Sequence, residues 1–142
     1  MKAIFYALIV LSLLGSPLSA IAEPSTPSQL VGILSVEPAM SALLVEAQIG
    51  AGNWEEARKS IDNGEASLEK RISPALAAAR GKADLIKAIK EYYLAAKAYF
   101  DGVWPQSDVP NLVYRAQVSR LKSEMRSKSD ALELELKLSG LK

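Results

Sequence analysis

Apolar residues recur at intervals of three or four along most of this 142-residue chain, and this helical period restricts its fold more than any other feature. Glycine and proline residues divide the pattern into four long amphipathic segments joined by mostly short connections. Such a succession is typical of an all-α protein. We therefore predict an antiparallel up-down-up-down four-helix bundle with a kinked first helix, and the spacing of the stripes favours helix crossing angles of about 20°.

The first predicted helix begins with a clear capping signal. Thr26-Pro27-Ser28-Gln29 combines a capping hydroxyl, a proline at the first helical position and a glutamine at the third, which is the spacing of a capping box. Pro38 removes one backbone donor and is expected to kink this helix or to divide it in two. Residues 50–52 (Gly-Ala-Gly) are expected to end it. The predicted apolar stripe comprises Leu30, Ile33, Leu34, Met40, Leu43, Leu44 and Ala47.

The second predicted helix begins after Asn53, which is placed to cap it together with Glu56 three residues later. Its apolar stripe starts at Trp54 and continues at spacings of three and four. Ser73-Pro74 leaves two interpretations open, a kink within one helix or a reversal of the chain. The apolar register continues past this proline, so we favour one kinked helix that ends near Gly81.

The third helix is expected over residues 82–101, and the fourth is expected to follow Asp108 as its N-cap. The alternation of leucine with charged residues near the carboxyl end has the period of a strand, but Leu, Glu and Lys are good helix formers, so we predict helix. In a helix Leu134 and Leu138 point away from the core stripe, where they are exposed or cover a partner in a homodimer. The stripes comprise Leu85, Ile86, Ile89, Tyr92, Tyr93, Ala96 and Phe100 in the third helix, and Tyr114, Val118, Leu121, Met125, Leu132 and Leu136 in the fourth.

The segment from Leu44 to Ala57 (LVEAQIGAGNWEEA) resembles the middle of a tetratricopeptide repeat, in which a helix, a tight Gly-Asn or Gly-Asp turn and an aromatic residue precede Glu-Glu-Ala. Ile61 and Gly64 fall where that family carries a large and a small apolar residue. The resemblance implies a helical hairpin. However, a shift by about 34 residues finds no second copy, and a solenoid needs about three repeats to bury its core. We therefore interpret the segment as a single helical hairpin.

Residues 1–22 have the composition of a cleaved signal peptide. Lys2 supplies the positive start, Ala3 to Leu14 form an apolar stretch, and Ala20-Ile21-Ala22 is a cleavage site with small residues at both ends. The apolar stretch is shorter than the about 20 residues of a membrane anchor. We expect cleavage after Ala22, a single bundle domain over residues 23–142 without a membrane-spanning segment, and a periplasmic or secreted location.

The composition excludes several kinds of chemistry. The chain has no Cys and no His, which rules out disulfides, thiolate catalysis, Cys/His zinc sites and the Ser-His-Asp triad. Lys2 is the only charge in the first 22 residues, so the rest carries 16 basic and 16 acidic side chains, and a neutral chain is a poor match for nucleic acid. We expect no haem or other cofactor, because Met40 and Met125, the two possible haem ligands, lie on apolar stripes. We expect no metal, because the acidic residues alternate with basic ones on outward sides of the helices.

Two groups of residues are candidate contact surfaces. In an up-down bundle the first turn and the last connection lie at the same end, which gathers a set that we call the aromatic pole. This set either plugs the end of the bundle or lines a groove for a small apolar ligand or a peptide. A basic face on the fourth helix is either a solvated surface with internal ion pairs or a patch for anionic lipid or acidic envelope polymer. The aromatic pole comprises Trp54, Tyr99, Phe100, Trp104 and Tyr114; the basic face comprises Arg115, Arg120, Lys122 and Arg126, continued by Lys128.

These observations predict an exported, non-enzymatic helical-bundle protein that acts through protein or envelope contacts, as an accessory, chaperone-like or inhibitor-like module. One alternative is a bundle that binds a small ligand or cofactor at the aromatic pole. A second alternative is a carboxylate-dependent hydrolase acting on envelope polymer, for which Glu46 and Glu91 are the best candidates because each adjoins an apolar stripe.

Overall fold

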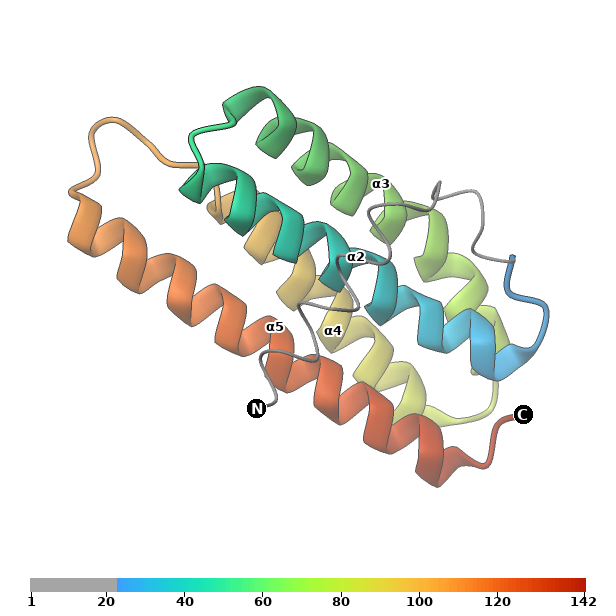
Figure 1. Cartoon of the computed structure of the whole chain (residues 1–142). Helices are drawn as coiled ribbons and strands as arrows, with labels where there is room; N and C mark the ends of the chain where they lie inside the picture. The colour runs from blue at the N-terminus through green and yellow to red at the C-terminus, as the bar shows by residue number, and fades with distance from the viewer. Residues whose placement is uncertain (1–22) are drawn as a thin grey trace, which may run out of the picture.

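The computed structural model of the chain describes residues 23–142, which form four helices packed as an up-down bundle (Figure 1). The helices are α2 (Pro27–Gly50), α3 (Trp54–Ala78), α4 (Ala83–Gly102) and α5 (Asn111–Ser139). The predicted all-α class and bundle architecture are confirmed. The predicted signal peptide, residues 1–22, lies outside the described residues.

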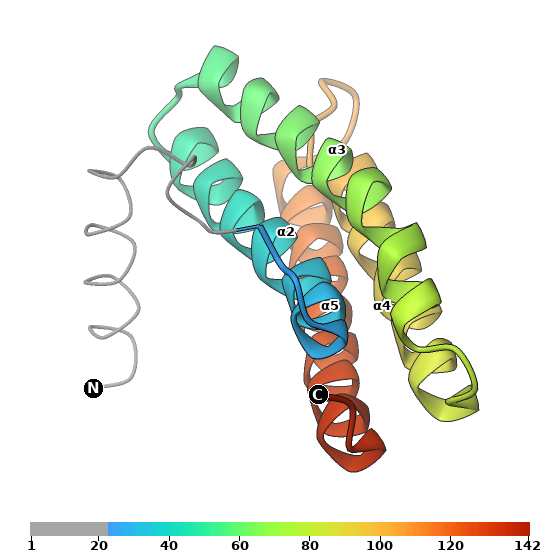
Figure 2. The ribbon, with the colours of Figure 1, turned by 90° about the vertical axis from the view of Figure 1, so that its right-hand side faces the viewer.

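The bundle consists of two helical hairpins laid against each other. α2 packs mainly on α3, and α4 packs mainly on α5. Figure 2 shows the α2–α3 pair lying in front of the α4–α5 pair. The turn between the pairs contains Gly81 with a φ of 82°, a conformation that glycine adopts without strain.

The start of α2 matches its predicted signal. The Thr26 hydroxyl accepts a hydrogen bond from the Gln29 backbone N–H at 3.3 Å, and the Gln29 side chain accepts from the Thr26 backbone N–H at 3.2 Å, so the capping box is confirmed. Pro38 lies inside α2, which runs as one helix and is not divided there. The kink at Pro38 stays a prediction.

α3 confirms the favoured interpretation of Ser73-Pro74 and corrects the expectation about its cap. It continues through Pro74 to Ala78 as one helix and ends near Gly81, so the chain does not reverse at Ser73-Pro74. Asn53 precedes the helix, but its side chain makes no capping hydrogen bond. Its ψ is 70°, compared with 153° at Thr26, so its backbone lacks the extended geometry of a side-chain cap. Glu56, its predicted partner, instead accepts a hydrogen bond from Lys59.

The start of α5 corrects another expectation, because Asp108 does not cap it. The helix begins at Asn111 with Pro110 in the capping position, and the Pro110 carbonyl accepts from the Tyr114 N–H at 3.0 Å. A helix that began directly after Asp108 would place Val109 in a helical conformation, which the following proline disfavours.

α4 supplies the centre of the core, where Tyr92, Tyr99 and Phe100 are almost fully buried. Phe100 packs on Gly64 of α3 so closely that a Cβ at Gly64 would overlap its ring. The predicted stripe of α5 is confirmed, since Met125 and Leu132 are buried and its other members are half-buried. The prediction that the carboxyl end is helical is also confirmed, and Leu134 and Leu138 are exposed on it.

The predicted stripe of α2, in contrast, is largely wrong. Of its members only Leu34 is buried, and the other buried residues of the helix are Val31, Pro38 and Val45. Leu43, predicted to face the core, is 45% exposed. α2 is apolar on every side, so the spacing of its apolar residues does not indicate which side faces the core.

Candidate contact surfaces

The side of α2 that points away from α4 is an exposed apolar surface, which we call the α2 outer face. The opposite side is fixed by α4, because the hydroxyl of Tyr92 donates to the Ser35 carbonyl and that of Tyr99 donates to the Ala42 carbonyl, both at 3.3 Å. The α2 outer face consists of Ile33, Val36, Ala39, Met40, Leu43, Leu44 and Ala47, of which Val36, Ala39, Leu43 and Ala47 are exposed and the others half-buried.

No charged side chain lies on the α2 outer face. α2 contains only two charged residues, Glu37 and Glu46, and both are turned toward neighbouring helices. The Glu37 carboxylate accepts two hydrogen bonds from Arg71 of α3, at 2.8 and 3.1 Å, and a third from Ser67. Glu46 accepts from Lys122 of α5 at 2.7 Å. The uncharged surface therefore extends from Ile33 to Ala47, which is about 21 Å along a helix of 24 residues.

The apolar composition of α2 also bears on whether this helix could cross a membrane. Among the helices of the described residues, α2 is the one long and apolar enough to cross a membrane, although core helices of water-soluble proteins meet the same criterion. In the structure its buried side contributes Val31, Leu34 and Val45 to the bundle core, so this side is occupied by the other helices.

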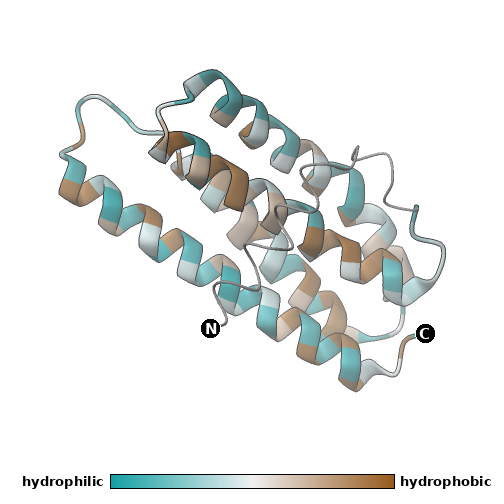
Figure 3. Ribbon diagram, in the orientation of Figure 1, coloured by the Kyte–Doolittle hydropathy of each residue, from teal (hydrophilic) through white to brown (hydrophobic). Residues whose placement is uncertain are grey.

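The predicted basic face of α5 divides into two parts. Lys122 points toward α2, where it pairs with Glu46, and Arg126 follows on the same side one helical turn later. Arg115 lines a hollow together with Ile49 of α2. Figure 3 shows the two helices side by side, with brown apolar residues along α2 and mainly teal polar residues along α5.

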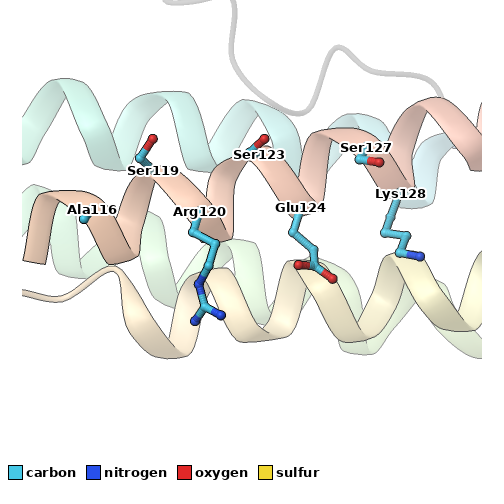
Figure 4. A pocket seen from close by; sticks show the side chains of 7 residues that line it. All are labelled: Ala116, Ser119, Arg120, Ser123, Glu124, Ser127 and Lys128. Atoms are coloured by element: carbon cyan, nitrogen blue, oxygen red, sulfur yellow. The ribbon is translucent and has the colours of Figure 1, made fainter. Parts of the chain in front are cut away.

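Arg120 belongs to the other part of the basic face. Figure 4 shows Arg120, Glu124 and Lys128 pointing from α5 toward α4, in a shallow hollow along α5. Lys128 pairs there with Glu91 of α4 at 3.1 Å. Acidic and basic side chains alternate in this part, so their charges largely offset each other.

The aromatic pole is brought together in part. The rings of Trp54 and Trp104 lie edge to face with centroids 5.9 Å apart, and the Arg58 guanidinium stacks over Trp104 at 4.2 Å. The Tyr114 hydroxyl donates to the Val103 carbonyl at 2.7 Å and fastens the long connection to α5. The two indoles therefore share one end of the bundle.

Tyr99 and Phe100 lie deeper, in the core, with their rings 5.2 Å apart. Burial raises the pKa of the Tyr99 hydroxyl far above its usual range, and the neighbouring Glu46 carboxylate adds to this shift. The surface part of the pole is a groove of about 450 Å³, whose lining includes Trp54, Tyr114 and Arg115.

The candidate catalytic carboxylates lie in ion pairs between helices, and the candidate haem-binding methionines lie on apolar sides of helices. Glu46 and Glu91 each form an ion pair that joins two helices, which gives the hydrolase alternative no support. Met125 is buried in the core of α5 and Met40 is half-buried on α2. Within residues 23–142 no group of three or more acidic side chains is arranged to hold a metal ion.

No family model, no curated protein and no solved structure matches this chain. The segment that resembles a tetratricopeptide repeat occupies the end of α2, the turn and the start of α3, which form a single helical hairpin. Function is therefore inferred from the geometry of this chain alone.

Reasoning from the sequence did not single out the α2 outer face as a surface. The signal was present, because Glu37 and Glu46 are the only charged residues between Pro27 and Gly50. A helix with so few charges is buried on all sides or contacts something apolar. In this bundle α3, α4 and α5 cover only one side of α2.

Proposed function

We propose that this chain is an exported, non-enzymatic helical-bundle protein that acts through contacts of its surface with components of the cell envelope. The observation that supports this best is the α2 outer face, an uncharged and exposed surface along a helix of 24 residues. Continuous apolar surfaces of this kind mark interaction sites. Residues 1–22 direct export in this proposal and are removed after Ala22, and Pro38 bends α2.

Site-specific crosslinking in the cells that produce the protein tests this function. A photoreactive amino acid is placed at Leu43 on the α2 outer face, and a matched one is placed at Leu94 of α4, which is 64% exposed on the side of α4 away from Tyr92. We expect an exported protein whose first residue is Glu23, with adducts to envelope components from position 43 and few from position 94. A chain retained with residues 1–22 in the cytoplasm, or equal adducts from both positions, would overturn the proposal.

A second candidate function, binding of a small ligand at the aromatic pole, is favoured by the groove beside Trp54, Tyr114 and Arg115. Trp54 is half-exposed there and lies against Trp104, so a ligand in the groove would alter the fluorescence of the indole pair. Envelope extract should quench this fluorescence in the wild type and leave a Trp54→Phe, Tyr114→Ala variant unaffected. Indoles that do not respond to the extract would remove this candidate.

A further inference from the structure

We infer that the α2 outer face lies flat on an anionic lipid surface, with Arg126 of α5 beside its edge and Arg115 beside the carboxyl-terminal end of α2, where both meet lipid phosphate groups. This inference rests on the proposed function and names the component of the envelope that is contacted. An interfacial helix of this kind buries an apolar side at the boundary of the acyl chains and keeps cationic side chains at the level of the headgroups.

The first argument is the chemistry of the α2 outer face itself. Its members are aliphatic or Met side chains, and no aromatic residue occurs anywhere in α2. Protein interfaces concentrate their binding energy in Trp, Tyr and Arg and use hydrogen bonds to fix orientation. A surface with neither aromatic anchors nor charged groups fits an acyl-chain boundary, which needs no directional contacts.

The second argument is the position of the cations. The ion pair between Lys122 and Glu46 fixes α5 beside α2, and Arg115 lines a hollow with Ile49 near the end of α2. Arg126 lies one turn beyond Lys122 on the same side of α5. The basic row is about 16 Å long, since the helix rises about 1.5 Å per residue between positions 115 and 126. It begins beside Ile49 at the end of α2, passes Glu46, and reaches the edge of the α2 outer face at Arg126.

The third argument is the availability of these charges. Lys122 is engaged by Glu46, whereas within residues 23–142 neither Arg115 nor Arg126 has a carboxylate within 4.0 Å. Both arginines are exposed. Charge complementarity with a phosphate surface follows, although residues 23–142 as a whole are formally neutral.

Vesicle binding tests the inference with the exported, processed protein. Flotation with vesicles of phosphatidylglycerol and phosphatidylethanolamine is compared with flotation with phosphatidylcholine vesicles. The face variant is Val36→Glu, Leu43→Glu, the charge variant is Arg115→Glu, Arg126→Glu, and the matched control is Leu94→Glu, which adds a charge at an exposed leucine of α4. Circular dichroism establishes that each variant is folded.

We expect binding to the anionic vesicles that is at least about tenfold stronger than binding to phosphatidylcholine and that falls as salt is added. Binding should weaken by more than about tenfold in the face variant, weaken by about tenfold in the charge variant, and stay unchanged in Leu94→Glu. An alkaline carbonate wash should release the protein, because it lies on the bilayer and does not span it.

Four results would overturn the inference: equal binding to both kinds of vesicle, wild-type binding by the face variant, resistance to the carbonate wash, or a dimer in solution whose dissociation is the sole effect of the face variant. Its failure is distinguishable from failure of the proposed function. Absent vesicle binding with persistent adducts at position 43 would mean that the α2 outer face contacts a protein. Absence of both would remove the contact function as well.

Discussion

α2 and α4 are both long helices of the same bundle, but they meet its core in different ways. α4 has one apolar side and one charged side, and the apolar side is buried as Leu85, Ile89, Tyr92 and Phe100. α2 is apolar around its whole circumference and buries one side of it. The hydrophobic effect is proportional to the buried apolar area and is not directional. Burial of the single apolar side of α4 therefore determines the rotation of α4 about its axis. Because every side of α2 is apolar, the same effect leaves the rotation of α2 undetermined.

Polar contacts therefore determine how α2 is rotated. The Glu37 carboxylate is held by Arg71, Glu46 by Lys122, and two carbonyls of α2 accept hydrogen bonds from tyrosines of α4. Each contact is modest, but a different rotation of α2 would bury Glu37 or Glu46 against apolar side chains without a partner. In α4 the side chains that fill the core also orient the helix, whereas in α2 a few polar anchors orient it.

Truncating one apolar side chain in each helix tests this difference, and here we expect the largest effect. Ile89→Ala in α4 removes a fully buried side chain and should lower the free energy of unfolding by about 3 kcal/mol. Leu43→Ala in α2 removes an exposed one and should cost less than about 1 kcal/mol. Urea denaturation at two protein concentrations measures both. An equal, concentration-dependent cost at Leu43 would contradict the comparison, because it would mean that a second copy covers the α2 outer face.

Arg71→Met removes the main anchor of α2 and should lower the free energy of unfolding by about 3 kcal/mol. The Arg71 side chain is only 8% exposed, and its loss leaves the Glu37 carboxylate without a cation in a largely buried position. Glu37 also raises the pKa of Arg71, so the guanidinium stays charged at every pH of interest. Lys70→Met is the control, since Lys70 is exposed and pairs with the exposed Glu23, and it should change stability little. Similar losses in both variants would show that the anchor has no special role.

The same difference explains how much of the fold could be predicted. The buried sides of α4 and α5 were predicted because their apolar residues stand on one side, and the meeting of Trp54 with Trp104 followed from the order of the helices. The buried side of α2 could not be predicted, because it depends on partners such as Arg71 and Glu37, which are 34 residues apart. Spacing along a helix contains no information about such a pair.

Helix caps were predictable only where the backbone allowed them. Thr26 has the extended conformation that lets its hydroxyl reach the third helical residue, whereas Asn53 does not. Asp108 was a plausible cap by residue type, but Pro110 moves the start of α5 past it. Of the candidate contact surfaces, the indole pair was predictable and the α2 outer face was not.

Alanine substitutions at two glycines should change stability by smaller amounts and in opposite directions, one at a closely packed glycine of α3 and one at an open position of α2. Gly64→Ala places a methyl group against the ring of Phe100 and should cost about 2 kcal/mol, although alanine is the better helix former. In Gly32→Ala of α2, no atom of residues 23–142 apart from the chain neighbours and the local helix backbone lies within 4 Å of the new Cβ, and the substitution should stabilise the protein by about 0.5–1 kcal/mol. Thermal unfolding followed by circular dichroism measures both. A destabilising Gly32→Ala would indicate that another chain packs closely at this position.

The last prediction concerns the Tyr99 hydroxyl of α4, whose hydrogen bond is shared between the Ala42 carbonyl and the Glu46 carboxylate of α2, each 3.3 Å away. At neutral pH Tyr99→Phe should lower the free energy of unfolding by about 1 kcal/mol, since the ring stays in place and one hydrogen bond is lost.

The pH dependence of stability gives the sharper test of the Tyr99 hydroxyl. Burial raises the pKa of Tyr99 above 10, its value in the unfolded chain, so the unfolded state releases this proton first. The contribution of Tyr99 is fully present below pH 10 and falls by about 1.4 kcal/mol for each pH unit above it. Urea denaturation between pH 8 and pH 11 should therefore show a steeper alkaline loss in the wild type than in Tyr99→Phe, while lysine titration contributes equally to both. Parallel curves would mean that the Tyr99 hydroxyl is open to water, and that this bond does not help to set the rotation of α2.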